Sequence, residues 1–189
     1  MTATRSLSLA LVAFAACSSH GEPTADSSRG ATDTVGALDA ASRWVVMPKG
    51  YGPVLAGMTF EALGRALGEV VRPASGAGSG CVYVRPAALP KDVLVMLQDD
   101  SVARVDVRAR GVLTAEGAGV GDTEASVLQR YEGRVRVTPH KYTGPVGHYL
   151  TVSAPPDSAH LIVFETDGRT VVNYRAGFRR AVSLVEGCS

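Results

Sequence analysis

The sequence predicts an α+β protein built from two tandem repeats, each a short helix followed by about three antiparallel strands. A helix-starting segment at residues 57–68 returns in degenerate form at residues 121–133. Each copy is followed by apolar runs of strand length that turn residues separate. This order of a helix and then hairpins does not supply the crossover connections of a parallel sheet, so we expect antiparallel strands.

The two helices are predicted from their capping residues. In each copy a threonine caps the start, a glutamate lies in the positively polarised first turn, and a glycine ends the helix. These residues are Thr59, Glu61 and Gly68 in the first copy and Thr123, Glu124 and Gly133 in the second. The apolar stripes are Phe60, Leu63 and Leu67, and Val127, Leu128 and Tyr131. Helices this short need a sheet to cover them.

Three strand candidates follow each helix. They cover residues 81–84, 93–97 and 102–108 in the first copy and residues 148–152, 160–164 and 169–175 in the second. The two copies align when 67 is added to the residue numbers 93–108, and Val107 is then equivalent to Tyr174. Asp167-Gly168, between two apolar runs, predicts a two-residue hairpin turn, because such turns require positive φ. The two sheets either join edge to edge or belong to two small domains that face each other.

Residues 1–16 have the composition of an export signal, with one positive charge, a short apolar run and then small residues. The run ends in residues 14–17, which resemble the bacterial lipobox, where Cys17 would be diacylated and become the mature N-terminus. Phe14 departs from that motif, since an aliphatic residue is usual there, and residues 13–15 also satisfy an ordinary signal-peptidase site. We expect a lipoprotein anchored at Cys17, with a secreted soluble protein as the alternative.

Residues 17–43 are mostly Ser, Thr, Gly, Ala and Asp, with hardly any large apolar side chain. Such a segment cannot bury enough surface to order itself, so we predict a disordered tether. Ordered structure is expected to begin near Trp44, with repeat 1 over residues 44–117 and repeat 2 over residues 118–189.

The chain has three cysteines, Cys17, Cys81 and Cys188. If Cys17 is lipidated, an even number remains, and outside the cytoplasm such thiols usually oxidise. We therefore expect a disulfide between Cys81 and Cys188, which would tie repeat 1 to the end of repeat 2. The alternative is a pair of buried free thiols.

Charge and motifs exclude several classes of function. Removal of residues 1–16 leaves 18 basic and 18 acidic side chains, without the basic excess that nucleic-acid binding needs, so no nucleic-acid partner is expected. The glycine-rich run at 76–80 lacks the lysine and hydroxyl residue of a phosphate loop. Glu165 and Asp167 are explained by strand alternation and turn chemistry. We expect no enzymatic activity and no cofactor.

Three histidines, His140, His148 and His160, have the chemistry of metal ligands, but their spacing fits no defined metal motif. We therefore expect no metal site. The simpler interpretation has His148 and His160 at strand starts and His140 in a loop.

The candidate binding loop spans residues 138–149. Its distinctive side chains are His140, Lys141, Tyr142, His148 and Tyr149. Aromatic and mixed-polar loops on rigid sheets are common binding sites, and the alternative is an ordinary β-loop whose tyrosines pack on the sheet edge. A further candidate is an anion-facing patch made of Arg175, Arg179 and Arg180. The alternative is that these side chains lie on a strand face exposed to solvent.

The duplicated Gly-x-Thr helix start, the closing glycine and the following hairpin resemble the fold of the β-lactamase inhibitor protein (BLIP). They are also similar to the small outer-membrane assembly lipoproteins of the BamE/SmpA type, which carry one such unit. More closely, the chain resembles a group of uncharacterised bacterial exported proteins. The resemblance implies a rigid module that binds other proteins without catalysis. The expected Cys81–Cys188 bridge departs from it, because the inhibitor's bridges lie within its repeats.

The function expected from the sequence is that of a cell-envelope lipoprotein acting as a non-enzymatic protein-binding module. Its partner would be an envelope or secreted protein, and it would contact the membrane through the lipid anchor alone. The alternative is a secreted inhibitor of a hydrolase, such as a β-lactamase or a protease.

Overall fold

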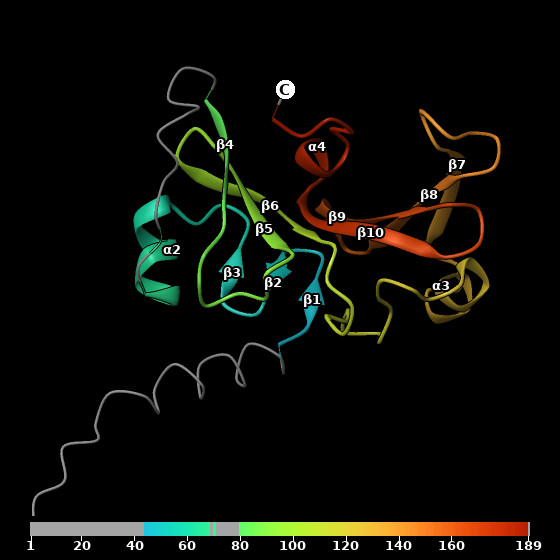
Figure 1. The fold of residues 1–189 in the computed structure, drawn as a ribbon, viewed down its shortest axis with the longest axis horizontal. Coiled ribbons are helices and arrows are strands. Elements are labelled where there is room, and N and C mark those ends of the chain that lie inside the picture. Colours follow the sequence, from blue (N-terminus) through green and yellow to red (C-terminus); the bar gives the residue numbers. More distant parts are fainter. Residues whose placement is uncertain (1–43, 69, 71–79, 189) are drawn as a thin grey trace, which may run out of the picture. The chain divides into compact units, whose positions relative to one another are not determined.

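The computed structural model describes residues 44–68, 70 and 80–188. Residues 1–43 lie outside this part, so the predicted export signal, Cys17 and the predicted tether are not described. The glycine-rich run at 76–80 is described only at Gly80. Within the described residues the protein is a mixture of few helices and mostly antiparallel sheet (Figure 1). The described part contains no helix that is both long enough and apolar enough to span a membrane.

A seven-stranded antiparallel sheet organises the fold. In spatial order its strands are β4 (Cys81–Val84), β5 (Val93–Gln98), β6 (Ser101–Val107), β10 (Val171–Phe178), β9 (Asp157–Thr166), β8 (His148–Ala154) and β7 (Val135–Pro139). β6 and β10 join the two halves, with Val107 opposite Tyr174 and Asp106 opposite Arg175. The predicted strands of both halves thus meet edge to edge in one sheet.

A small sheet and short helices complete the described part. The small sheet consists of β1 (Val46–Met47), β2 (Gly50–Tyr51) and β3 (Val54–Leu55). The helices are α2 (Phe60–Leu67), α3 (Glu124–Arg130) and α4 (Arg179–Val182). Both predicted N-caps are present, because Thr59 Oγ1 accepts a hydrogen bond from the N–H of Ala62, and Thr123 Oγ1 accepts one from Ser126.

The predicted helix ends hold in only one of the two cases. Gly68 ends α2 with a φ of +82°. For α3 the prediction is wrong, because the helix stops at Arg130 and Gly133 lies three residues further on. Tyr131 leaves the helical conformation and turns its ring into the core, where its hydroxyl donates to Thr114 Oγ1 at 2.7 Å. Burial of an aromatic ring therefore decides where this helix ends.

The predicted hairpin at Asp167-Gly168 is present between β9 and β10, but its turn is wider than the predicted two residues. Asp99 and Asp100, with φ of +47° and +61°, form the two-residue turn between β5 and β6. The connection between β9 and β10 instead spans four residues, 167–170. Asp167 Oδ1 accepts hydrogen bonds from the N–H groups two and three residues ahead, which stabilises this wider turn.

β7 was not predicted, and it gives the second half of the sheet four strands where about three were expected. The segment Val135–Pro139 alternates only briefly and ends in proline, which weakens its strand signal. The small sheet was not predicted either, because its strands are two residues long.

The core lies on one face of the large sheet, which we call the core face. It packs against α2, α3 and the small sheet. Its largest buried side chains are Tyr51, Tyr131, Tyr174, Phe164 and Leu63. Burial raises the pKa of the Tyr174 hydroxyl, which donates to the carbonyl of Val112 at 2.9 Å and is thereby satisfied.

We call the opposite side of the sheet the open face. It carries polar side chains, and the C-terminal residues 179–188, which we call the strap, lie across it. Ala181 and Val182 of the strap are buried against apolar side chains of this face. Figure 1 shows α4 on the other side of the sheet from the small sheet and α3. The strap divides the open face into separate clefts.

Candidate binding face

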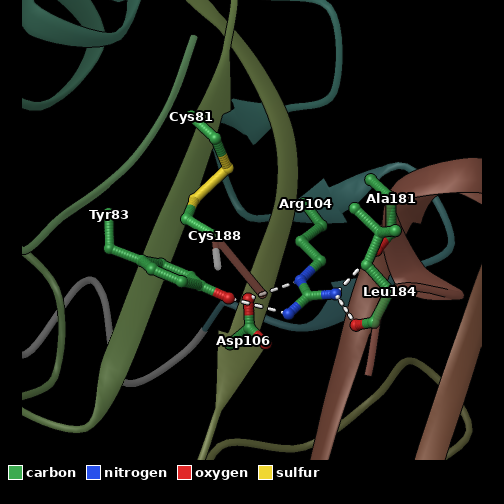
Figure 2. Close-up of a disulfide and its surroundings, with 7 residues drawn as sticks. All are labelled: Cys81, Tyr83, Arg104, Asp106, Ala181, Leu184 and Cys188. Atoms are coloured by element: carbon green, nitrogen blue, oxygen red, sulfur yellow. Dashed lines mark hydrogen bonds and ion pairs between the residues drawn. A yellow bond between two sulfur atoms is a disulfide. The ribbon is translucent and has the colours of Figure 1, made fainter. Parts of the chain in front are cut away.

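A disulfide fastens the end of the strap to the sheet. It joins Cys81 of β4 to Cys188, whose Cα atoms are 5.4 Å apart. Figure 2 shows this bridge beside Tyr83 and close to Arg104. This is the pair expected from the sequence, and it links an edge strand of the first half to the strap.

Arg104 of β6 links the sheet to the middle of the strap (Figure 2). Its side chain is only 3% exposed. Nη1 donates to the carbonyl oxygens of Ala181 and Leu184, both at 2.6 Å. Nη2 donates to the Tyr83 hydroxyl at 2.7 Å, and Nε donates to Asp106 at 2.9 Å. The guanidinium therefore satisfies carbonyls at the end of α4, where a positive charge is favourable.

Arg175 of β10 is a second buried guanidinium, 4% exposed. Its Nε donates to the carbonyl of Val182 in the strap, and its Nη1 pairs with Glu165. Asn173 Nδ2 donates to the other carboxylate oxygen of Glu165 at 2.8 Å. Burial raises the pKa of Glu165, but the hydrogen bonds from Arg175 and Asn173 and the charge of Arg175 outweigh it and hold the pKa below its usual value.

His140 organises the candidate binding loop. Its Nδ1 accepts hydrogen bonds from the N–H groups of Tyr142 and Thr143, at 3.1 and 3.3 Å. The imidazole stacks on the ring of Tyr149, with ring centroids 4.5 Å apart, and its Nε2 lies 3.8 Å from Glu165 Oε2. His140 and Tyr149 therefore belong to the cluster around Arg175.

Lys141 and Tyr142 connect the same loop to the strap. Lys141 Nζ donates to Glu186 Oε1 at 2.9 Å, and the Tyr142 hydroxyl donates to the same oxygen. These hydrogen bonds, from Tyr142 first and Lys141 second, lower the pKa of Glu186. The loop still presents apolar surface to solvent, since Tyr142 and Val146 are 60% and 65% exposed.

His148 lies apart from this cluster, although it was named with it. Its Nδ1 is 2.8 Å from Glu124 at the start of α3. His160 is likewise 2.8 Å from its own partner, Asp157. Each of the three histidines therefore faces a different carboxylate, and within residues 44–68, 70 and 80–188 no group of three or more His, Cys, Asp or Glu is placed to hold a metal ion.

The clefts of the open face lie on both sides of the strap. On the β4 side, a cleft of about 270 Å³ is lined by the two buried guanidiniums and by the exposed Arg85 and Arg108. On the β7 side, clefts of about 310 and 410 Å³ share Arg136 and Thr151.

Charge is distributed unevenly over the protein. A further cleft lies beside Lys141. Among the described residues, the charged side chains that line the four clefts comprise eight Arg or Lys and three Asp or Glu. Within the described residues, the lining of these clefts is therefore positive, although the whole chain has a formal charge of only +1.

Arg175 and the 138–149 loop were named from the sequence as binding candidates, whereas Arg104 and Glu186 were not. Strand alternation places Arg104 on the face away from the core, and without the strap that face is expected to meet solvent. The sequence contains no signal that residues 179–188 fold back over it. Of the predicted anion-facing patch, Arg175 is buried, whereas Arg179 and Arg180 are exposed.

Comparisons with known proteins give little further information. No protein-family model and no curated protein sequence matches the chain. A solved structure, that of the uncharacterised protein YfeY from Escherichia coli, is similar to it with 12% sequence identity and a TM-score of 0.45. The similarity covers 70% of this chain and 99% of YfeY. The comparisons give no support for membership of the BLIP or BamE families.

Proposed function

We propose that this protein is a non-enzymatic binding module of the cell envelope and that the open face receives a protein partner. The observation that carries the proposal is the concentration of arginine and tyrosine side chains on this face, around clefts on both sides of the strap. Arginine and tyrosine dominate the energetics of protein interfaces, because they combine a large contact area with directional hydrogen bonds. An ordered sheet holds them in fixed positions.

The internal bonding of the polar groups supports binding rather than chemistry. Arg104 and Arg175 donate to carbonyl groups of the strap, and Glu165 is held by Arg175 and Asn173. These side chains therefore fix the strap on the sheet. Within the described residues, the exposed arginines Arg85, Arg108 and Arg136 make no ion pair or side-chain hydrogen bond, so they are available to a partner.

We propose that residues 1–16 are an export signal, that residues 17–43 are a tether, and that Cys17 is lipidated. The composition of these segments supports this location, with a secreted protein as the alternative. Substitution Cys17→Ala is expected to move the protein from the membrane fraction to the soluble fraction of the envelope. Unchanged fractionation would refute the lipid anchor and leave the binding proposal intact.

We also propose that the chain is a duplication, with repeat 1 over residues 44–117 and repeat 2 over residues 118–189. The mirrored spatial order of β4-β5-β6 and β8-β9-β10 around the central pair supports it. Val107 and Tyr174, equivalent by the sequence offset of 67, lie opposite each other in that pair, as a local two-fold axis requires. On this proposal β7 is an addition to repeat 2.

The binding proposal is tested by crosslinking the full chain in its native envelope and identifying captured proteins by mass spectrometry. The variant Arg108→Glu/Arg136→Glu changes the open face on both sides of the strap. Lys49→Glu, in the turn between β1 and β2, is the matched control for a change of charge. We expect the open-face variant to lose a partner that wild type and Lys49→Glu both retain.

If Arg108→Glu/Arg136→Glu and Lys49→Glu capture the same proteins in the same amounts, the open face is refuted as the binding surface. A panel of β-lactamases and proteases, assayed with the purified protein, tests whether the partner is a hydrolase that the protein inhibits. Hydrolysis of a substrate by the purified protein itself would overturn the non-enzymatic proposal.

A further inference from the structure

Among the described residues no strand pairs with the outer edge of β7, so this edge offers main-chain groups to a partner. β7 is the last strand of the sheet, and its ladder with β8 is bounded by hydrogen bonds from Ser153 N to Arg134 O and from His140 N to Gly147 O. In an antiparallel ladder, alternate residues direct their N–H and C=O groups toward the paired strand. Even-numbered residues of β7 therefore face β8, and the main-chain groups of Val135 and Val137 point away from it.

A positively charged trough runs beside this edge on the open face. It consists of the two clefts that share Arg136 and Thr151. Four guanidinium groups line it, those of Arg134, Arg136, Arg175 and Arg179, and within the described residues no Asp or Glu does. The hydroxyl groups of Thr138, Thr151 and Ser153 also line it. The chemistry of the trough therefore selects negative charge.

Arg136 is the member of this group that is available to a ligand. Arg175 is neutralised by Glu165, Arg134 lies 3.0 Å from Glu116, and Arg179 donates to the carbonyl of Ser158. Arg136 is exposed, and within the described part of the chain it makes no ion pair or side-chain hydrogen bond. It stands on β7 opposite Thr151, so its side chain lies at the junction of the two clefts.

We infer that β7 accepts an added strand from an acidic protein segment, in which carboxylate and apolar side chains alternate. An added antiparallel strand would hydrogen-bond to Val135 and Val137 and would place one residue directly opposite Arg136. That pair is the non-hydrogen-bonded kind, in which side chains lie closest, so an acidic residue there would meet the guanidinium.

In the added strand, the residues before and after the one opposite Arg136 would direct their side chains to the core face of the sheet. There they would meet Val137, which is 46% exposed, and the half-buried Val135. Apolar side chains therefore fit these positions. The inference deepens the proposed function, on which it rests, by naming the edge and the chemistry of the partner segment.

A synthetic peptide of about eight residues that alternates glutamate and valine tests this inference, because that length matches a typical strand. Its binding to the full chain is measured by fluorescence anisotropy at low and physiological salt, with a lysine-valine peptide as the charge control. We expect the glutamate peptide to bind and Arg136→Glu to weaken it about tenfold, since an attractive cross-strand pair becomes repulsive. Lys49→Glu, in the turn between β1 and β2, is expected to leave the affinity of the glutamate peptide unchanged.

Strand addition is separated from simple charge attraction by Val137→Pro. This substitution removes an outward N–H without breaking the β8 ladder, and edge positions tolerate proline. We expect it to abolish binding, whereas Val137→Ala retains it. A peptide N-methylated at alternate residues makes the same test on unaltered protein, and hydrogen exchange at the Val137 amide is expected to slow when the unmodified peptide binds.

Several results would overturn the inference. They are no binding of the glutamate peptide at millimolar concentration, equal affinity in Arg136→Glu, or full binding by both Val137→Pro and the N-methylated peptide. Tripolyphosphate that binds as tightly, with the same dependence on Arg136, would show a general anion site and would also overturn it. If crosslinked capture depends on Arg108 but not on Arg136, the proposed function stands and this inference fails.

Discussion

Removing the Cys81–Cys188 disulfide is expected to cost a large part of the protein's stability. The bridge closes a loop with a sequence separation of 107 residues. In the chain-entropy model, loss of a crosslink over a loop of this length destabilises the folded state by about 4 to 5 kcal/mol at 25 °C. A typical domain has a total stability of about 5 to 15 kcal/mol, so the variant Cys81→Ala/Cys188→Ala should lose a large fraction of it and still be folded in the absence of urea.

The native sheet should nevertheless persist in this variant, because other contacts hold the strap. Arg104 donates to Ala181 and Leu184, and Arg175 donates to Val182. These bonds do not depend on the bridge. We therefore expect hydrogen exchange to accelerate more in the last residues of the strap than in α4.

Urea unfolding of the oxidised wild type and of the double variant, both with Cys17→Ala to remove the remaining thiol, measures the difference. The free energy of unfolding should fall by about 4 to 5 kcal/mol. The circular dichroism spectrum in the absence of urea should stay the same. A loss below about 1 kcal/mol would refute the loop-entropy reasoning, since chain constraint predicts several times that value.

Three further predictions concern the caps and the buried charges. Thr123→Ala, which removes the N-cap of α3, should lower the free energy of unfolding by about 1 kcal/mol in urea titration, and Thr123→Ser should restore most of it. Arg104→Met leaves Asp106, whose side chain is 14% exposed, without its counter-ion, and should destabilise the protein by about 3 to 5 kcal/mol; a loss within error of zero would contradict the pairing. The folded-state pKa of Glu165 lies below its ordinary value of 4.5, so its pairing with Arg175 stabilises the protein above that pH and is lost as the pH falls below it. The melting temperature should therefore decrease on acidification, and Glu165→Gln should show a smaller decrease than wild type.

Local sequence signals were sufficient where a few neighbouring residues decide the structure. Thr59 and Thr123 start their helices because each side chain bonds to an N–H three residues ahead. Such contacts form within one turn and need no tertiary context. The same reasoning failed at Gly133, because burial of the Tyr131 ring ended α3 earlier than the glycine.

The candidate site was predictable only in part. The 138–149 loop was identified from its composition, and its His140, Lys141, Tyr142 and Tyr149 do contact the strap or the cluster around Arg175. His148 was assigned to the same group but points to Glu124 instead. Alternation along a strand says that neighbouring side chains face opposite sides, and it does not say which element covers either side.

The sequence by itself determined the class of fold, the starts of both predicted helices and the approximate position of the strands in the large sheet. These follow from capping chemistry and from the period of apolar residues, which act over a few residues. Only the tertiary structure decided that the two halves share one sheet, that β7 extends it, and that the strap covers the open face. Those outcomes depend on contacts between residues far apart in the chain. Arg104, for example, can be buried only because its guanidinium donates to the carbonyl of Leu184, which lies about eighty residues further along the chain.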